Sequence, residues 1–345
     1  MVYLGLSMRL HVNMEALNMA ENIGNIARHK RAPVVVRTVR GGQPVYVIKH
    51  VPVISGQSIA HGYQEVLARI ASIKGLPVCP YCLNGIFIKH STDEVIKKVS
   101  ELGYSYADEL LEHARMGSED GIHKFEKTVI SNCIVEDVGG FLYTGKPPVK
   151  RTSRFQAGYM IPALEQYAST GMEAVIHSRQ GLGARDGRHS IYYVELGSSI
   201  YTVSMGLDLD GIGCTGSLKR EPLEDKMERM KTALEALAAL IGNAQWGANR
   251  SRFLPHWDIE SLVAVVSHPL PFNPAPGHYK RYILDTVARA SRYRRIVSRL
   301  GGYVEVYYYV NNGAPVDEPR DGAVRVEDPI DAVLSVEDKL EDASC

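Results

Sequence analysis

Apolar and polar residues alternate strictly near the start of the chain, over residues 2–13. The apolar side chains at every second position are Leu4, Leu6, Met8, Leu10 and Val12. This spacing predicts a β-strand with one buried face. Two further β-rich runs, residues 33–38 and 45–48, are separated by an Arg-Gly-Gly sequence and predict a hairpin.

Helical spacing first appears over residues 57–74. The apolar face of this predicted helix consists of Ile59, Tyr63, Val66, Leu67 and Ile70. Ser55 is the predicted N-cap, and Gly75 is the predicted stop.

The second half of the chain also alternates between strands and helices. Residues 191–209 predict a strand, a Gly-Ser-Ser turn and a second strand. Helices are predicted over residues 222–241 and 279–300, and strands over residues 262–266 and 303–310. With insertions set aside, the order is strand, helix, strand pair, helix, strand. This βαββαβ order predicts an α+β protein with a ferredoxin-like core.

Two stretches interrupt this order and are predicted insertions. Residues 76–126 are acidic and helical, and residues 144–189 are basic with little periodicity. Residues 127–143 have strand-like composition. The predicted divisions are a discontinuous α+β domain of residues 1–75, 127–143 and 190–310, the helical lobe 76–126, the basic insertion 144–189 and an acidic tail 311–345. The tail is expected to be partly disordered.

Composition limits the class of protein. The chain has 345 residues, of which 45% are hydrophobic, enough for a large core. No apolar run approaches the roughly 18 residues that a membrane span needs, and the first residues lack a signal-peptide pattern. We therefore expect a soluble, cytoplasmic protein without a membrane partner. Its five cysteines are too few for a disulfide framework, so reduced thiols are expected.

Charges cancel in sum but are segregated along the sequence. The formal net charge is zero. Residues 22–64 contain six Lys or Arg and no acid, and residues 138–164 and 236–257 also lack acids. The compensating acids gather in residues 91–126 and 315–345. Such segregation predicts basic surfaces, which are typical of nucleic-acid binding.

The basic quartet of residues 28–31, RHKR, lies in the longest acid-free run. It follows a predicted turn in which Asn22 and Asn25 flank Gly24. Two interpretations remain open, a site for nucleic-acid phosphates or a solvated loop beside the acidic lobe. Several acid-free basic runs in one chain favour the first interpretation.

The motif Cys79-Pro-Tyr-Cys82 has three interpretations. A redox pair needs its first cysteine at the start of a helix that follows a strand, whereas here a helix precedes the motif. A zinc site needs four ligands, for which His90, His113 and Cys133 are available without a regular spacing. A local disulfide or two free thiols is the third interpretation.

Two other patterns carry weak signals. The glycines of residues 211–216 match a dinucleotide-binding motif, but the next helix is expected near Pro222, too late for them to open it. Asp137, Asp186 and Asp208 are carboxylates that a metal-dependent nuclease could use, although no spacing pairs them. No cofactor is therefore predicted.

Four segments in combination carry a family resemblance. They are NMEALN with NIGNIARHKRAPVV near the start, VPVISGQSIAHGYQ (51–64), GNAQWGANRSRFLPHW (242–257) and VVSHPLPFNPAP (265–276). Together they make the chain, over residues 2–310, resemble the CRISPR-associated RAMP proteins of the DevR type. These are the backbone subunits of archaeal type I-A Cascade.

The resemblance implies an RRM-like palm with inserted finger and thumb elements, the thumb being the basic insertion. It also implies partners, namely CRISPR RNA, further copies in a helical filament, other Cascade subunits, and target DNA paired with the guide. Related type III subunits cut RNA with an aspartate in an early loop. Because residues 22–49 contain no acid, we expect binding without catalysis. The alternative is a metal-dependent ribonuclease of the same fold.

The resemblance and the basic runs together define the predicted RNA-binding residues. Those expected to contact phosphates are Arg28, Lys30, Arg31, Lys150, Arg151, Arg154, Arg250 and Arg252. Those expected to contact sugar or phosphate are Asn22, Asn25 and His29, with Ser55, Gly56, Gln57 and Ser58 at a helix N-terminus and His61 one turn further on. Phe155, Tyr159 and Met160 of the basic insertion are the candidates for contact with a base, the alternative being that they pack locally within the insertion.

Overall fold

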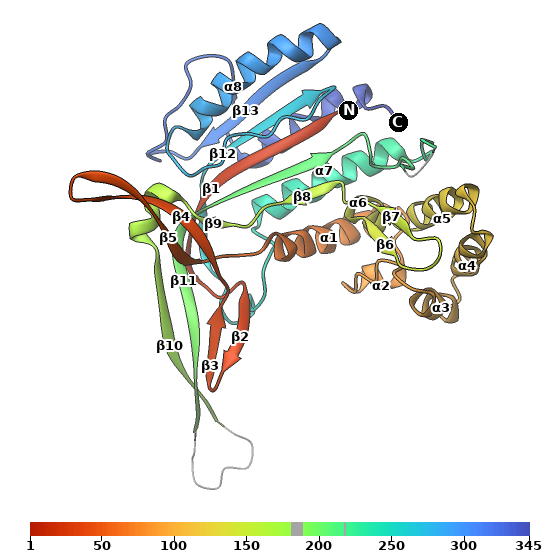
Figure 1. Cartoon of the computed structure of the whole chain (residues 1–345), viewed down its shortest axis with the longest axis horizontal. Helices are drawn as coiled ribbons and strands as arrows, with labels where there is room; N and C mark the ends of the chain where they lie inside the picture. Colours follow the sequence, from red (N-terminus) through yellow and green to blue (C-terminus); the bar gives the residue numbers. More distant parts are fainter. Residues whose placement is uncertain (181–188, 217–218) are drawn as a thin grey trace.

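A central antiparallel sheet organises the protein (Figure 1). The computed structural model describes residues 1–180, 189–216 and 219–345. Its four long strands lie in the order β13 (Tyr303–Val310), β12 (His256–His268), β1 (Tyr3–Glu15) and β11 (His189–Asp208). The prediction of an α+β protein is confirmed. The strands predicted over residues 2–13 and 303–310 are also present, as β1 and β13.

Two short strands of this sheet lie beside β11. Strands β8 (Phe155–Ala157) and β9 (Ile161–Pro162) pair antiparallel with its C-terminal half. The prediction of a turn within residues 191–209 is wrong, because β11 runs through this stretch without a break. A Cβ atom on Gly197 would lie 2.6 Å from Oε1 of Glu15. The glycine therefore leaves room for the buried side chain of Glu15 and does not form a turn.

Helices cover both faces of the sheet. Helices α1 (Gly56–Ile73) and α7 (Lys226–Gly242) pack on one face, where the Tyr63 hydroxyl donates to the carbonyl of Ala233 (3.0 Å). Helix α8 (Tyr282–Val297) packs on the other face, against Val263 and Val265. No helix in the described part of the chain is long and apolar enough to cross a membrane.

Both faces of β1 are buried, although its pattern predicts only one buried face. Leu4, Leu6 and the following alternate residues point into the core beneath α1 and α7. The opposite face lies under the segment that follows β12, where a Cβ on Gly5 would be 2.5 Å from the carbonyl oxygen of Phe272. Arg9 on this face is fully buried and pairs with Glu260 and Glu165. Polar positions of a strand can thus be interior when each has a partner.

The inserted lobe has its own core at the far end of α1 (Figure 1). Its helices are α2 (Pro80–Leu83), α3 (Asp93–Glu101), α4 (Tyr106–Met116), α5 (Glu119–Asn132) and α6 (Ile134–Gly139). The strand-like interpretation of residues 127–143 is wrong except at its end, where β6 (Phe141–Tyr143) pairs with β7 (Val149–Arg151). Phe125, Val129 and Ile130 recur at helical spacing, and this face is buried in the lobe.

Hairpins extend from the end of the sheet opposite the lobe (Figure 1). They are β2 (Met19–Ile23) with β3 (Ile26–His29), β4 (Arg31–Arg40) with β5 (Gln43–Pro52), and β10 (Gly171–Gln180) with β11. The β4–β5 pairing confirms the predicted hairpin. Part of the basic insertion forms β7 to β10 and the 3-10 helix η1 (Leu164–Ser169). Residues 181–188 of this insertion lie outside the described residues.

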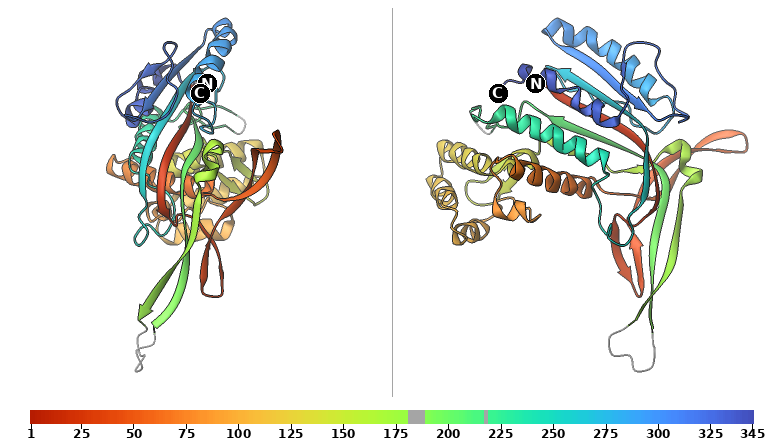
Figure 2. Two further views of the ribbon diagram at one scale, coloured as in Figure 1. Left: turned by 90° about the vertical axis from the view of Figure 1, so that its left-hand side faces the viewer. Right: turned by 180° about the vertical axis from the view of Figure 1, so that it is seen from behind.

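The acidic tail is folded, contrary to its predicted partial disorder. It forms β14 (Val324–Arg325), α9 (Pro329–Leu334) and the 3-10 helix η3 (Glu337–Asp342), and it crosses the same side of the sheet as α7 (Figure 2). Val333, Val336 and Leu340 are buried in the main core. A disulfide between Cys214 and Cys345 fixes the end of the tail, so the expectation of reduced thiols throughout is also wrong. Although the tail is rich in acidic residues, it also has an apolar face, which packs against α7 and β12.

Candidate nucleic-acid interface

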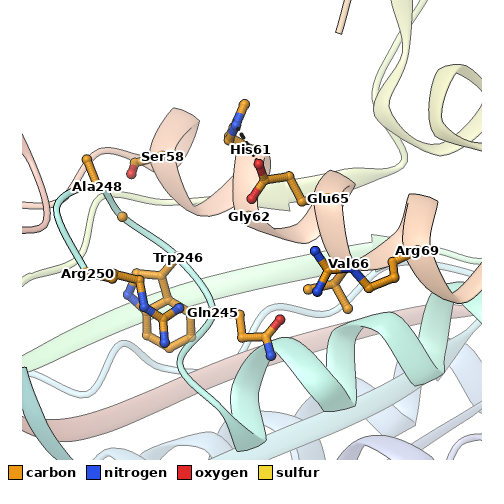
Figure 3. Close-up of a pocket in the computed structure, with 11 residues that line it drawn as sticks. Ser58, His61, Gly62, Glu65, Val66, Arg69, Gln245, Trp246, Ala248 and Arg250 are labelled. Carbon is orange, nitrogen blue, oxygen red and sulfur yellow. Dashed lines mark ion pairs between the residues drawn. The ribbon is translucent and has the colours of Figure 1, made fainter. Parts of the chain in front are cut away.

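A cleft of about 340 Å³ separates the outer face of α1 from the segment that follows α7 (Figure 3). Residues Gln245 to Arg250 form one wall, and the other wall carries Ser58, His61 and Arg69 of α1. A Cβ atom on Gly62 would lie 2.2 Å from the carbonyl oxygen of Gln245, so glycine lets the two walls approach. The cleft brings together three predicted residues, Ser58, His61 and Arg250.

The wall of residues 245–250 is held in place by hydrogen bonds to the residues that directly follow β1. The N–H of Ala248 donates to the carbonyl of Leu17 (2.8 Å), and the side-chain amide of Asn249 donates to the carbonyl of Ala16 (3.2 Å). Trp246 is buried in the main core below the cleft. These contacts place Arg250 on a rigid support at the cleft.

Two arginines give the cleft a positive potential. The side chain of Arg250 donates to the carbonyl of Asn243 (3.3 Å), and partial burial lowers the pKa of Arg250 below its ordinary value. Within the described ranges, neither Arg250 nor Arg69 has an acidic partner at ion-pair distance. The acid that lines the cleft, Glu65, lies 3.3 Å from Nε2 of His61. Arg69 is not among the predicted residues, although it lies eight positions after His61 and so on the same helical face.

The first turn of α1 opens beside this cleft. Its N-cap, Ser55, accepts a hydrogen bond from the N–H of Ser58 (3.3 Å), while its own N–H donates to Asn18 (2.8 Å). Ser55 and Gly56 are buried, and a Cβ on Gly56 would lie 2.1 Å from the carbonyl oxygen of Ala157. Both residues therefore shape the helix start, while Gln57 and Ser58 remain accessible to a ligand. The positive end of the helix dipole favours an anion there.

A lysine and a tyrosine lie next to the start of α1. The Lys30 ammonium is 5.5 Å from the ring centroid of Tyr159, whose side chain is 48% exposed. Backbone hydrogen bonds from Val53 to Lys30 and between Ile54 and Met160 fix both residues beside the first turn. A cation, an exposed ring and a helix N-terminus thus share one surface.

Arg28 and Arg31 lie beside an acid from another part of the chain. Glu195 on β11 is 3.0 Å from Nη2 of Arg31 and 3.6 Å from Nε of Arg28. Arg28 is also 3.6 Å from Glu21. The acid-free run in the sequence is therefore partly neutralised in the fold, while the side chains of both arginines keep about a third of their surface exposed.

His29 is a predicted RNA contact that the fold places in the interior. Its Nε2 lies 2.7 Å from Oε1 of Glu15, and both side chains are fully buried. Burial disfavours the charged imidazole, but the hydrogen bond and charge of Glu15 outweigh this, so the pKa of His29 is raised above 6.5. The prediction that His29 contacts RNA is therefore corrected to a structural role.

Arg151 is also buried and does not face a ligand. Its guanidinium contacts Asp137 and Glu126 and donates to the carbonyls of Gly211 and Cys214 (2.8 Å each). The Gly-rich segment 211–216 therefore wraps around a buried ion pair. The prediction of a phosphate contact is corrected, because Arg151 has no solvent-exposed surface in its side chain.

The remaining predicted residues are dispersed. Arg154 pairs with Asp208 (3.0 Å), and the Phe155 ring stacks on Tyr63 inside the core (centroids 4.1 Å apart). Phe155 therefore cannot contact a base without leaving the core. The predicted residues that are exposed but lie away from the cleft walls are Asn22 and Asn25 at the β2–β3 turn, Lys150 on β7 and Arg252.

The aspartates considered for a nuclease do not form a metal site in the described structure. Arg151 contacts Oδ1 of Asp137, and Arg229 (3.2 Å) and the N–H of Gly213 (2.9 Å) contact Oδ2. Asp208 pairs with Arg154, and Asp186 lies outside the described residues. The metal-ligand side chains that do cluster are cysteines.

Comparison with known proteins gives consistent matches over nearly the whole chain. A family model described as CRISPR-associated negative auto-regulator DevR/Csa2 matches residues 6–287. The CRISPR-associated aCascade subunit Cas7/Csa2 2 of Saccharolobus solfataricus is 38% identical over 320 residues, which are 90% of this chain and 93% of that protein. CRISPR-associated protein Cas7/Csa2 1 of the same organism is 32% identical over 327 residues, which are 92% and 96%.

A solved structure extends the comparison to the fold. One chain of a CRISPR RNA-guided surveillance complex in a pre-nicking state matches with a TM-score of 0.53 at 10% sequence identity. The match covers 98% of this chain and 100% of that one. At this identity the likeness concerns the fold alone.

Proposed function

The chain belongs to the DevR/Csa2 family of CRISPR-associated proteins, and on this premise we propose that it is a non-catalytic CRISPR RNA-binding subunit of a type I Cascade. The observation that carries the proposal is the cleft between α1 and residues 245–250, which has two arginines without acidic partners in the described structure. A relative named as an aCascade subunit matches 90% of the chain.

The cleft and the neighbouring surface provide the contacts that a single RNA strand needs. Arg69 and Arg250 would hold phosphates, and the first turn of α1 at Gln57 and Ser58 would hold another. Lys30 and Tyr159 would take the next nucleotide, with the exposed ring against a base. Phosphate contacts carry no sequence information, which suits a protein that must bind any guide.

We further propose that the sheet is an RRM-like palm. The order β12-β1-β11 with β8 and β9 at the edge, backed by α1 and α7, is that of a ferredoxin-like βαββαβ unit. The hairpins would then serve as finger and thumb elements that reach along the RNA.

The β4–β5 hairpin supports assembly with further copies of the chain. Val35, Val39 and Ile48 are 58%, 67% and 67% exposed, and Tyr46 is 74% exposed. Val35 pairs directly with Ile48 across the two strands. Such an exposed apolar patch is typical of a protein interface. A helical filament on the RNA, with other Cascade subunits and with target DNA paired to the guide, would place a neighbouring copy against this hairpin.

The test is RNA affinity as a function of salt. Each phosphate contact contributes about 0.7 to the slope of log affinity against log salt for single strands. The double variant Arg69→Ala/Arg250→Ala should therefore bind a CRISPR-repeat RNA more weakly, with a slope reduced by about 1.4. Arg295→Ala, on the exposed surface of α8, is the matched control and should bind like wild type.

Two results would contradict this proposal. Unchanged RNA affinity in a double variant that melts like wild type would remove the cleft from the binding site. Cleavage of complementary RNA that EDTA stops would instead establish a metal-dependent ribonuclease.

A further inference from the structure

Three cysteines from separate segments meet inside the protein. Cys79 is the N-cap of α2, Cys82 lies within α2, and Cys133 joins α5 to α6. Their Sγ atoms all lie within 4.8 Å of one another, and each residue is at most 1% exposed. The sequence gives no spacing rule that links Cys133 to the Cys-x-x-Cys pair, so the cluster is visible only in the fold.

A buried carboxylate and a buried imidazole adjoin this cluster. Oε1 of Glu136 lies 3.8 Å from Sγ of Cys82 and also accepts a hydrogen bond from the N–H of Lys89 (3.0 Å). Nδ1 of His90 is 3.5 Å from Oε2 of Glu136, and both side chains are fully buried. Neither of these two atoms makes a hydrogen bond to any residue that the structure describes. Within the described residues each of these two atoms has the other as its polar neighbour, and this pair holds the Glu136 carboxylate beside the thiols.

The burial and chemistry of the three cysteines decide between the redox, zinc and disulfide interpretations of the Cys79–Cys82 motif. Thiol-disulfide exchange with a substrate requires an accessible cysteine, and these three are buried. A disulfide between any two would leave the third thiol and the Glu136–His90 pair without a role. Thiolates with one carboxylate or imidazole are ligands for Zn²⁺, whereas Mg²⁺ and Ca²⁺ prefer oxygen.

We propose that Cys79, Cys82 and Cys133, with Glu136 as the fourth ligand, bind one structural Zn²⁺. His90 is then a positioning residue, because its imidazole orients the Glu136 carboxylate. The three cysteines belong to the main core where it meets the lobe, and Glu136 is buried on α6. The ion therefore fastens the first helix of the inserted lobe to its last two helices. This role is independent of RNA binding.

Metal content and thiol counts of the full-length, untagged protein test the proposal. Protein purified without chelator, or reduced and then incubated with Zn²⁺, should contain about one zinc per chain, as the single four-ligand site requires. A mercurial reagent that blocks thiols should release this zinc. Cys133→Ser and Glu136→Gln should bind less zinc, while Cys345→Ser, which removes only the tail disulfide, should keep it.

The wild-type protein alone can overturn the proposal, should the variants fail to fold. Of the five cysteines, Cys214 and Cys345 form the tail disulfide, so three thiols remain. Denatured, unreduced protein should therefore give three free thiols if zinc is bound. A single free thiol would establish a disulfide within the cluster, and three thiols without zinc after incubation would establish a metal-free cluster. A chelator should lower the melting temperature of the zinc protein, and an unchanged melting temperature would exclude a structural role.

Discussion

Nε2 of His29 lies 2.7 Å from Oε1 of Glu15, in a pair that is closed to solvent. Because the pKa of His29 is raised in the folded protein, the charged imidazole stabilises the fold. This contribution is complete below the unfolded pKa of about 6.5 and is lost as the pH rises through the folded pKa. His29→Gln should therefore cost about 2 kcal/mol near pH 6, the value of a hydrogen bond to a charged group. The cost should shrink above the folded pKa.

Urea unfolding of wild type and His29→Gln at several pH values measures this difference. Glu15 keeps its hydrogen bonds from Tyr201 (2.8 Å) and the N–H of Leu17 (2.9 Å) in the variant, so the variant should still fold. A difference in the free energy of unfolding that stays constant, or grows with pH, would contradict the assignment of charge to His29.

Lys150 and Arg151 are neighbours in sequence with opposite predicted effects. Arg151→Ala should destabilise the protein by about 3–5 kcal/mol, because it leaves the buried carboxylates of Asp137 and Glu126 without their shared partner. Lys150→Ala, at an exposed position of β7, should change stability by less than about 0.5 kcal/mol. Denaturant midpoints measure both variants.

Arg151→Lys provides the control for charge. A lysine keeps the positive charge but cannot reproduce the five hydrogen bonds of the guanidinium, so it should restore only part of the lost stability. An Arg151→Ala protein that has normal stability but weak RNA binding would overturn the structural role and restore the original prediction of a phosphate contact.

Apolar patterns in the sequence predict an element correctly where one packed face of that element determines their spacing. The alternation in β1 and the apolar face of α1 each predict their element, because burial on a single packed face fixes the spacing. Gly197 leads to a wrong prediction because the residue that it accommodates is distant in the sequence. The residue that requires a glycine there, Glu15, is 182 positions away in the chain, so local composition predicts a turn where the strand continues.

In the candidate site, too, the sequence predicts some residues correctly and others wrongly. Ser58 and His61 are recognisable from their place on α1, and Arg250 from its acid-free segment. His29 and Arg151 are basic residues in acid-free segments too, but their partners Glu15 and Asp137 lie outside those segments and reach them only in the fold. A basic run therefore predicts where cations gather, and not which of them remain accessible.

Glu195 is predicted to limit RNA affinity. It neutralises Arg31 (3.0 Å) and Arg28 (3.6 Å), two residues that the sequence predicts to contact phosphates. Glu195→Gln removes this charge, while the amide oxygen can still accept the hydrogen bond from the N–H of His29. RNA affinity should increase, and the salt slope should become steeper by about 0.7 for each arginine that gains a phosphate.

Glu173→Gln is the matched control for Glu195→Gln. Glu173 lies exposed on β10 of the same hairpin, so its replacement changes the net charge equally without releasing an arginine. Equal salt slopes for the two variants would show a general charge effect and would remove Arg28 and Arg31 from the binding site.

The disulfide between Cys214 and Cys345 is predicted to stabilise the whole chain, because it closes a loop across 131 positions. The loss of chain entropy in the unfolded state for a loop of this length corresponds to about 4–5 kcal/mol. Cys345→Ser should therefore lower the denaturant midpoint under non-reducing conditions. Val333 and Leu340 remain buried in the main core, so the variant's tail should stay docked and resist proteolysis at native conditions.

A reductant should bring wild type to the midpoint of the variant and leave the variant unchanged. Equal midpoints without reductant would show that the bond does not form in solution.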